Sequence, residues 1–413
     1  MPPCRKTAKT FSGRIPLEVV HLIVDELDAL LEKVPDRRKA GKNVALVCRG
    51  WRSLGYGLVW SKRVVVLRPK KDILAGVLKH LKSSPTAAES VRELTIDGPG
   101  HKSLWPSEEA LEELFTLCHN LVRLTVDAAA PRAIKLLETV LQAGNSRLTH
   151  LTLRTCGFHQ DPFPPADLLR LVLSFPRLVS LPGVINLASS SNVAHPQRPE
   201  NAPTLSLARL SLSVGSEQFQ PGNSELHQAF WRGFTASLDA KALQHLDNGL
   251  FHRDLSLLSF LPTCTNLTTL HLTTLESGKF LVPDLTPVLT KFTTLRDFQL
   301  LFNKTSLGVV APVLRAAFLN SLPASVETYD CNVALRVGAE PLEGFLEERK
   351  ALALRKVKVA VYRRDEKGEV VIANREKAFD YVLLERAGKE DAGGEDEVEA
   401  EKEWKVVETR QWW

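Results

Sequence analysis

Residues 121–126 read LVRLTV and residues 148–153 read LTHLTL, and these two stretches decide the fold. Both follow the pattern L-x-x-L-x-L, with apolar residues at the first, fourth and sixth positions. The last two apolar residues are separated by one polar residue, as on the buried face of a β-strand. The two stretches begin 27 positions apart, and a strand motif that recurs at such a spacing indicates a repeat architecture.

The same pattern recurs between residues 91 and 359. Successive copies begin 27 to 31 residues apart, except for one interval of 60 that predicts a further copy within 234–248, at Leu238 or Leu246. A unit of about 29 residues has room for a strand, a turn, a helix and a return turn. The apolar positions are Val91/Leu94/Ile96, Leu121/Leu124/Val126, Leu148/Leu151/Leu153, Leu178/Leu181 (two positions only), Leu207/Leu210/Leu212, Leu267/Leu270/Leu272, Leu295/Phe298/Leu300, Val326/Tyr329/Cys331 and Leu354/Val357/Val359.

The segments between these strands have the features of amphipathic helices. Each begins at or near a proline, which is suited to the first helical turn, and carries leucines at helical spacing. The chain therefore resembles the leucine-rich-repeat family over residues 90–361. This resemblance implies an α/β solenoid of about ten units, which we place at 68–361. The expected helices are Pro106–Leu117, Pro131–Leu141, Pro165–Ser174, Pro283–Lys291 and Pro312–Leu322.

Several segments depart from the repeat. Polar stretches near 186–204 and 215–224 are predicted to be loops. After a last strand at Arg355–Tyr362, residues 362–385 are expected to form a cap of one hairpin and one helix near Arg375–Leu384, because a terminal repeat exposes an apolar face. The first 11 residues and the acidic segment 386–413 are predicted to be disordered.

Residues 12–67 do not follow the period and have the pattern of a small three-helix module. The motifs occur in the order Leu-Pro-x-Glu, two aliphatic residues at helical spacing, Val-Cys-(Lys/Arg)-x-Trp and a Leu-Trp pair. This ordered set resembles the F-box family. The departures are Ile for the first Leu, one residue inserted in the Leu-Trp pair, and a first interhelix stretch about six residues longer than usual. The matches are Ile15-Pro16-Leu17-Glu18, Ile23, Leu27, Val47-Cys48-Arg49-Gly50-Trp51, Leu54 and Leu58-Val59-Trp60.

The combination of an F-box with leucine-rich repeats implies a function. It is similar to the substrate receptors of Skp–cullin–F-box ubiquitin ligases, which are non-catalytic subunits. The resemblance implies that the Skp adaptor, and through it the cullin–RING partner, binds the F-box, while the repeats bind a protein substrate. The expected adaptor-binding residues are Ile15, Pro16, Leu17, Val20, Ile23, Leu27, Val47, Cys48, Trp51, Leu54, Leu58 and Trp60.

Candidate substrate-binding residues are the polar residues that alternate with the strand leucines. They are expected to face away from the core, because successive side chains of a strand point to opposite faces. Their charges are mixed, and the alternative explanation is a solvated sheet face with no ligand. They are Glu93, Asp97, Arg123, Asp127, His150, Arg154, Arg209, His271, Asp297, Asp330, Lys356 and Lys358.

The sequence argues against several other functions. It has no H-E-x-x-H, G-x-S-x-G or P-loop motif, so we predict no enzyme activity and no cofactor. The six cysteines form no C-x-x-C pair and the histidines are dispersed, so no metal site is predicted. Nowhere do 18 apolar residues run together, which predicts a cytoplasmic or nuclear protein. Scattered charge disfavours nucleic-acid binding. A protein-interaction scaffold that does not act in a ligase remains the alternative.

Overall fold

The computed structural model describes residues 34–47, 55, 59–66, 73–98, 105–145, 147–154, 163–186, 204–215, 224–251, 255–274, 278–302, 318, 321–335, 356–362, 379–386 and 404–411. The chain divides into two compact units, Met1–Ala188 and Ser189–Trp413. In the described part of the chain, none of the helices has both the length and the apolar character needed to cross a bilayer.

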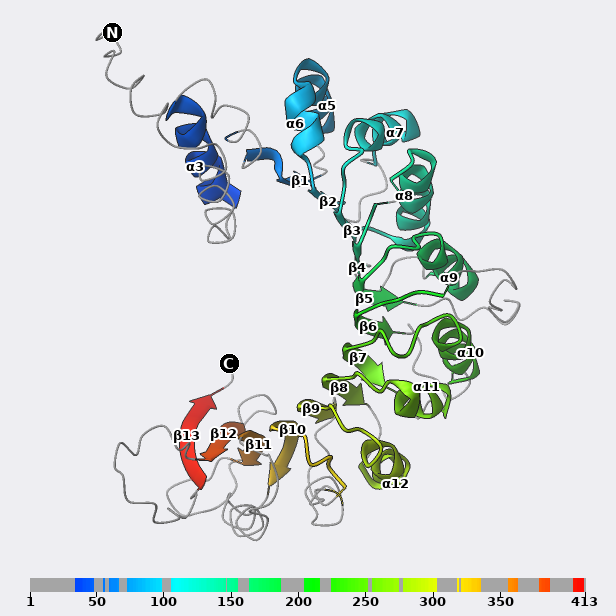
Figure 1. Cartoon of the computed structure of the whole chain (residues 1–413), viewed down its shortest axis with the longest axis vertical. Coiled ribbons are helices and arrows are strands. Elements are labelled where there is room, and N and C mark those ends of the chain that lie inside the picture. The colour runs from blue at the N-terminus through cyan, green and yellow to red at the C-terminus, as the bar shows by residue number, and fades with distance from the viewer. Residues whose placement is uncertain are drawn as a thin grey trace. The chain divides into compact units, whose positions relative to one another are not determined.

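Unit 1 is a parallel sheet with helices on one side. Strands β1 to β5 pair in chain order and all run parallel. Helices α5 to α9 lie on the same side of these strands (Figure 1). The elements are α3 (Val34–Val47), β1 (Lys62–Val66), α5 (Ile73–Ser83), α6 (Pro85–Ser90), β2 (Glu93–Asp97), α7 (Glu108–Leu117), β3 (Arg123–Asp127), α8 (Ala130–Gln142), β4 (His150–Arg154), α9 (Pro165–Leu173) and β5 (Ser180–Asn186).

Unit 2 repeats this arrangement and then changes strand direction. Strands β6 to β11 pair in chain order and run parallel. Strands β12 and β13 continue the sheet in antiparallel pairing. The elements are β6 (Arg209–Gly215), α10 (Ser224–Thr235), β7 (His245–Phe251), α11 (Leu255–Phe260), a 3-10 turn (Leu261–Thr263), β8 (Thr269–Thr274), α12 (Gly278–Leu289), β9 (Asp297–Phe302), β10 (Thr328–Leu335), β11 (Lys356–Tyr362), β12 (Phe379–Arg386) and β13 (Trp404–Gln411).

The repeated apolar positions form the core between sheet and helices. In the three repeats that contain β2, β3 and β4, all nine apolar residues of the pattern are at most 1% exposed. Full burial of one such aliphatic side chain contributes about 1.5–3 kcal/mol. The α/β solenoid predicted from the repeat pattern is therefore the observed architecture of each unit. The expected helices at 106–117, 131–141, 165–174 and 283–291 correspond to α7, α8, α9 and α12, whereas 312–322 lies mostly outside the described residues.

Two turns with the same sequence pattern connect neighbouring repeats. Asn120 Nδ2 donates to the carbonyl of Glu89 at 3.2 Å, and Asn266 Nδ2 donates to the carbonyl of Lys241 at 2.8 Å. Each asparagine follows a cysteine by two positions, and both cysteines, Cys118 and Cys264, are buried. The Cys-x-Asn-Leu turn therefore fixes one repeat to the turn of the repeat before it.

Ion pairs connect neighbouring helices of unit 1. Lys82 of α5 pairs with Glu113 of α7, and Lys135 of α8 pairs with Glu108 of α7. Arg170 of α9 is 2.7 Å from Glu138 of α8. Exposed pairs of this kind contribute at most about 1 kcal/mol each, so the stability of the unit comes mainly from its leucine core.

The repeat missing from the sequence pattern is Leu243/Leu246/Asn248. Leu246 is its second position and not its first, because Leu246 pairs with Leu210 in the register of β6 and β7. Leu238 forms an isolated bridge with Leu205 instead. Asn248 is fully buried at the place where most other repeats have an apolar residue, so this repeat does not match the motif at its third position.

The boundary that we predicted between the F-box segment and the repeats, at residues 67 and 68, is too late in the chain because of strand β1. Lys62–Val66 lies within the segment 12–67 that we assigned to the F-box, yet it pairs with β2 as the first strand of the sheet. In this register Arg63 is opposite Leu94 and Val65 is opposite Ile96. Because an arginine takes the central apolar position, this strand does not match the repeat motif.

The C-terminal predictions were partly wrong. The strand at Arg355–Tyr362 is confirmed as β11, but the expected helix near Arg375–Leu384 is replaced by strand β12. The segment 386–413 is not disordered throughout, because Trp404–Gln411 forms β13. Both strands obtain their backbone hydrogen bonds from a neighbouring strand, and local composition does not reveal such a partner. The predicted hairpin, the two loops and the first 11 residues lie largely outside the described residues.

Candidate functional site

The candidate site is the face of each sheet that is opposite the helices, which we call the strand face. Its residues alternate with the buried leucines, and the parallel register places them in rows across the strands. In unit 1 one row is Glu93, Arg123, His150 and Ser180, and a second is Asp97, Asp127, Arg154 and Val184. The predicted substrate-binding residues of this unit thus lie next to one another.

The first row of unit 1 contains an ion pair beside a histidine. Arg123 Nη1 lies 3.3 Å from Glu93 Oε1. The pKa of His150 is lowered from its ordinary value, first because the ring is partly buried and then because Arg123 is close, while Glu93 acts in the opposite direction. Thr149 Oγ1 lies 2.8 Å from His150 Nδ1. This row therefore favours a neutral His150 ring next to Arg123, whose charge is balanced by Glu93.

The second row of unit 1 places two carboxylates together. Asp97 and Asp127 are partners in the register of β2 and β3, and Arg154 is the partner of Asp127 in β4. The pKa of Asp127 is raised, first by burial and then by repulsion from Asp97, although Arg154 lowers it. Such a row suits a ligand that donates hydrogen bonds or carries positive charge.

Unit 2 has two longer rows on its strand face. Hydrogen bonds connect neighbouring strands: Ser211 Oγ donates to Asp247 Oδ2 at 2.9 Å, and Gln299 Nε2 donates to Asp330 Oδ2 at 2.8 Å. The predicted residues Arg209, His271, Asp297, Asp330, Lys356 and Lys358 all lie in these rows. The rows are Arg209, His245, Thr269, Asp297, Thr328, Lys356 and Ser211, Asp247, His271, Gln299, Asp330, Lys358.

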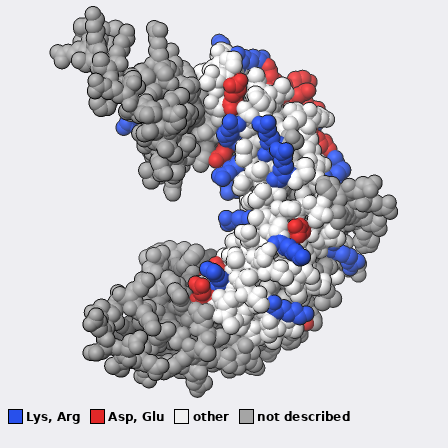
Figure 2. All heavy atoms as spheres, viewed as in Figure 1, with Lys and Arg blue, Asp and Glu red and all other residues white. Residues whose placement is uncertain are grey.

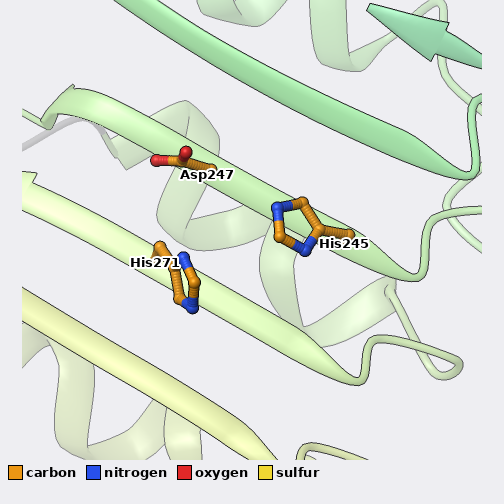
Figure 3. Close-up of side chains that lie close together, drawn as sticks. All are labelled: His245, Asp247 and His271. Atoms are coloured by element: carbon orange, nitrogen blue, oxygen red, sulfur yellow. The ribbon is translucent and has the colours of Figure 1, made fainter. Parts of the chain in front are cut away.

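Three of these side chains gather on β7 and β8 (Figure 3). His245, Asp247 and His271 each offer one donor atom, and these atoms all lie within 4.8 Å of one another. The rings of the two histidines are 5.5 Å apart in an edge-to-face arrangement. The sequence did not single out this set, because 24 residues separate Asp247 from His271 and only the strand register brings them together.

The segment with the F-box resemblance is described only in part. Its helix α3 packs closely at Gly41, where a Cβ atom would lie 2.6 Å from Val59 Cγ2. Part of the long stretch that we expected between two helices is helical, because α3 begins at Val34. Trp60 is only 7% exposed and its ring stacks on His80 with centroids 4.6 Å apart. Trp60 therefore packs inside unit 1 and does not present its side chain to a partner in this structure.

The other predicted adaptor-binding residues have no described side chain. Val47 is the last residue of α3. Its neighbour Leu46, which sequence reasoning did not select, is 82% exposed and is the most exposed large apolar side chain in the described part of the chain. The residues outside the described part are Ile15, Pro16, Leu17, Val20, Ile23, Leu27, Cys48, Trp51, Leu54 and Leu58.

Charges of both signs mingle on the visible surface of unit 1 (Figure 2). Ion pairs account for part of this mixture, as for Arg123 with Glu93 and Arg170 with Glu138. Basic and acidic side chains both occur among the described residues on the face shown in Figure 2.

Comparison with known proteins finds similarity among solved structures. No protein-family model matches the chain, and no curated protein matches it. Among solved structures, the leucine-rich repeat-containing protein LegL7 from Legionella pneumophila is 13% identical, with 75% of this chain and 92% of that chain covered and a TM-score of 0.35. A TM-score of this size does not establish a shared fold. The repeat architecture is therefore inferred from the strand register and the buried leucines of this chain.

Proposed function

We propose that this chain is the substrate-recognition subunit of a Skp–cullin–F-box ubiquitin ligase. Residues 12–61 would bind the Skp adaptor, and the strand faces of the repeats would bind a protein substrate. The proposal is supported by the ordered motifs between Ile15 and Trp60 and by the repeat units that follow them directly. A protein-interaction role suits a leucine-rich solenoid, whose exposed positions are free to vary without loss of the scaffold.

The exposure of Leu46 is the observation that supports the proposed binding of the Skp adaptor. Gly41 and Val44 of α3 are buried, whereas Leu46 is 82% exposed. At about 100° per residue, Leu46 lies on roughly the opposite side of the helix from Val44. An isolated exposed leucine is ordinary, but this one directly precedes the Val-Cys-Arg-Gly-Trp motif at 47–51. A partner that covers Leu46 would gain about 2 kcal/mol from its burial.

The strand faces supply the substrate-binding half. Their polar rows offer carboxylates, guanidinium groups and hydroxyl groups at the fixed spacing of a sheet, which is suited to a peptide or protein surface. The chain itself would perform no chemistry. It would hold a substrate lysine near a charged ubiquitin-conjugating enzyme and so raise the effective concentration of the two reactants.

Co-purification with the Skp adaptor tests the first half. We expect the wild-type chain to retain the adaptor, and both Leu46→Asp and the double variant Pro16→Ala/Trp51→Ala to lose it. Val179→Asp is the matched control, because Val179 is also an exposed apolar residue, 39% exposed, but lies outside residues 12–61. Retention of the adaptor by all variants, or by none including the wild type, would contradict the proposal.

Reconstituted ubiquitin transfer tests the second half. With cullin, RING protein, ubiquitin-activating enzyme and ubiquitin-conjugating enzyme added, proteins captured by the wild-type chain should become ubiquitinated. Capture by Leu46→Asp should persist without transfer, since the strand faces are unchanged. If adaptor binding is normal but no captured protein is modified, the chain is a scaffold and not a ligase receptor.

A further inference from the structure

His245, Asp247 and His271 project from one face of the unit 2 sheet. Asp247 and His271 are direct partners in the register of β7 and β8, and His245 precedes Asp247 by two positions on the same strand. Residues two apart on a strand share a face. Figure 3 shows one nitrogen of each imidazole ring on the side that faces the other two side chains.

The spacing of the donor atoms is close to that of a metal site. The three donors lie within 4.8 Å of one another. In a tetrahedral zinc site with bonds of about 2.0–2.2 Å, neighbouring donors are roughly 3.3 Å apart. Side-chain rotations that move each donor by about 1 Å would therefore close the site, and no change of the strand register is required.

His245 has an unsatisfied ring nitrogen at this place. Its Nε2 atom is buried and has no hydrogen-bond partner in the described part of the chain. A buried polar atom without a partner costs free energy, so its presence calls for an explanation such as an ion. Coordination of a cation by His245 would supply that explanation.

The other two side chains are already oriented by neighbouring strands. His271 Nε2 lies 3.0 Å from Asp297 Oδ2, which leaves Nδ1 of the same ring to bind an ion. Metal-binding histidines generally donate their second nitrogen to a carboxylate in this way. Asp247 accepts a hydrogen bond from Ser211, which fixes one carboxylate oxygen and leaves the other available.

We propose that His245, Asp247 and His271 form a binding site for a zinc-class divalent cation. Two imidazoles and one carboxylate are a ligand set that zinc uses when a fourth position is left open for water or another ligand. The site is on the strand face, so that open position faces solvent or a bound partner. The inference does not depend on the proposed role in ubiquitin transfer.

The electrostatic surroundings are compatible with a cation. Arg209 is the register partner of His245 and repels a cation, but Asp247 on the same strand as His245 and Asp297 beside His271 supply two carboxylates. The pKa of His245 is lowered, first by burial and then by Arg209 and His271, while Asp247 and Asp297 raise it.

Titration of the full-length chain tests the proposal directly. The protein, without a histidine tag and after removal of metal by a chelator, is titrated with Zn²⁺ by calorimetry and with Co²⁺ by visible absorption. We expect one ion per chain at this site and a cobalt spectrum of low coordination number. His245→Ala and His271→Ala should weaken binding by more than about 100-fold, and Asp297→Asn by about 10- to 100-fold.

His150→Ala is the matched control, since His150 is also a half-buried strand-face histidine with a lowered pKa but lies in unit 1. Its zinc affinity should equal that of the wild type. Equal zinc affinities in His245→Ala, His271→Ala and wild type would overturn the proposal, as would the absence of zinc binding by the wild type.

A second measurement needs no variant and so does not depend on the folding of one. Diethyl pyrocarbonate modifies accessible imidazoles, and peptide mass spectrometry locates the modified rings. Zinc should reduce the modification of His271 in the wild-type chain at least about tenfold, in proportion to occupancy, and should leave His150 unaffected. Equal modification of His271 with and without zinc would contradict the site.

Discussion

Cys118 and Cys264 show how burial determines chemistry at the scale of the residue. Each thiol ends a helix of a repeat and packs inside the core, and burial raises the pKa of each to about 12. Because the thiolate is the reactive form, these cysteines have a structural role and no redox or nucleophilic one.

Alkylation should therefore spare both thiols in the native protein. At pH 8 a thiol with a pKa of about 12 is ionised in about one molecule in 10⁴. Iodoacetamide should leave Cys118 and Cys264 unmodified in the native chain and should modify both in guanidinium chloride, as peptide mass spectrometry will show. Equal rates of modification in the two conditions would contradict their burial.

Leu151 represents the repeated core positions, because it is fully buried in β4. Leu151→Ala should lower the free energy of unfolding by about 2–5 kcal/mol, through lost apolar contact and the cavity that remains. Val179→Ala, at a position that is 39% exposed, should change it by no more than about 0.5 kcal/mol. Urea denaturation followed by circular dichroism measures both, and similar losses for the two variants would refute the assignment of the core.

The lowered pKa of His150 predicts the direction in which its contribution to stability changes with pH. Burial and Arg123 both favour the neutral ring, so the folded pKa lies below the unfolded one. The contribution of His150 to stability is therefore fully present above the unfolded pKa and is lost as the pH falls through the folded pKa. An NMR titration should show a lower pKa than in a short peptide, and Arg123→Gln should raise it. No rise in this variant would exclude the charge of Arg123 as a cause.

At the scale of the element, the sequence predicted what each repeat determines locally. Strands and helices of the repeats followed from leucine spacing and prolines. One repeat was predicted within 234–248 but its residues were not identified, because Asn248 replaces an apolar residue, and β1 was missed because Arg63 takes the central position. Strands β12 and β13 were missed because their hydrogen-bond partners are supplied by another strand. The cluster of His245, Asp247 and His271 was missed for a related reason, since it exists only in the register of β7 with β8.

Strand β13 gives the sharpest test at this scale, because its segment was expected to be disordered. Its backbone pairs with β12 from Trp404 to Gln411. Amide hydrogen exchange in this strand should be at least about tenfold slower than in a free peptide of the same sequence, as expected for amides that open only by local unfolding. Exchange at the rate of the free peptide would restore the original expectation of disorder.

At the scale of the whole molecule, the proposed function assigns separable roles to two parts of the chain. The segment before β1 carries the motif with an exposed leucine, and the repeats carry polar rows that differ between unit 1 and unit 2. A variant of one part should therefore leave the function of the other intact. This separation is what distinguishes a receptor that bridges two partners from a protein with a single binding surface.

The most direct test of the proposed receptor function is a calorimetric titration of the purified full-length chain with the Skp adaptor. We expect saturation at one adaptor per chain. Leu46→Asp should weaken the affinity by at least about tenfold, as expected when roughly 2 kcal/mol of apolar burial is lost, and Val179→Asp should leave it unchanged. No binding by the wild type, or the same affinity for both variants, would contradict it.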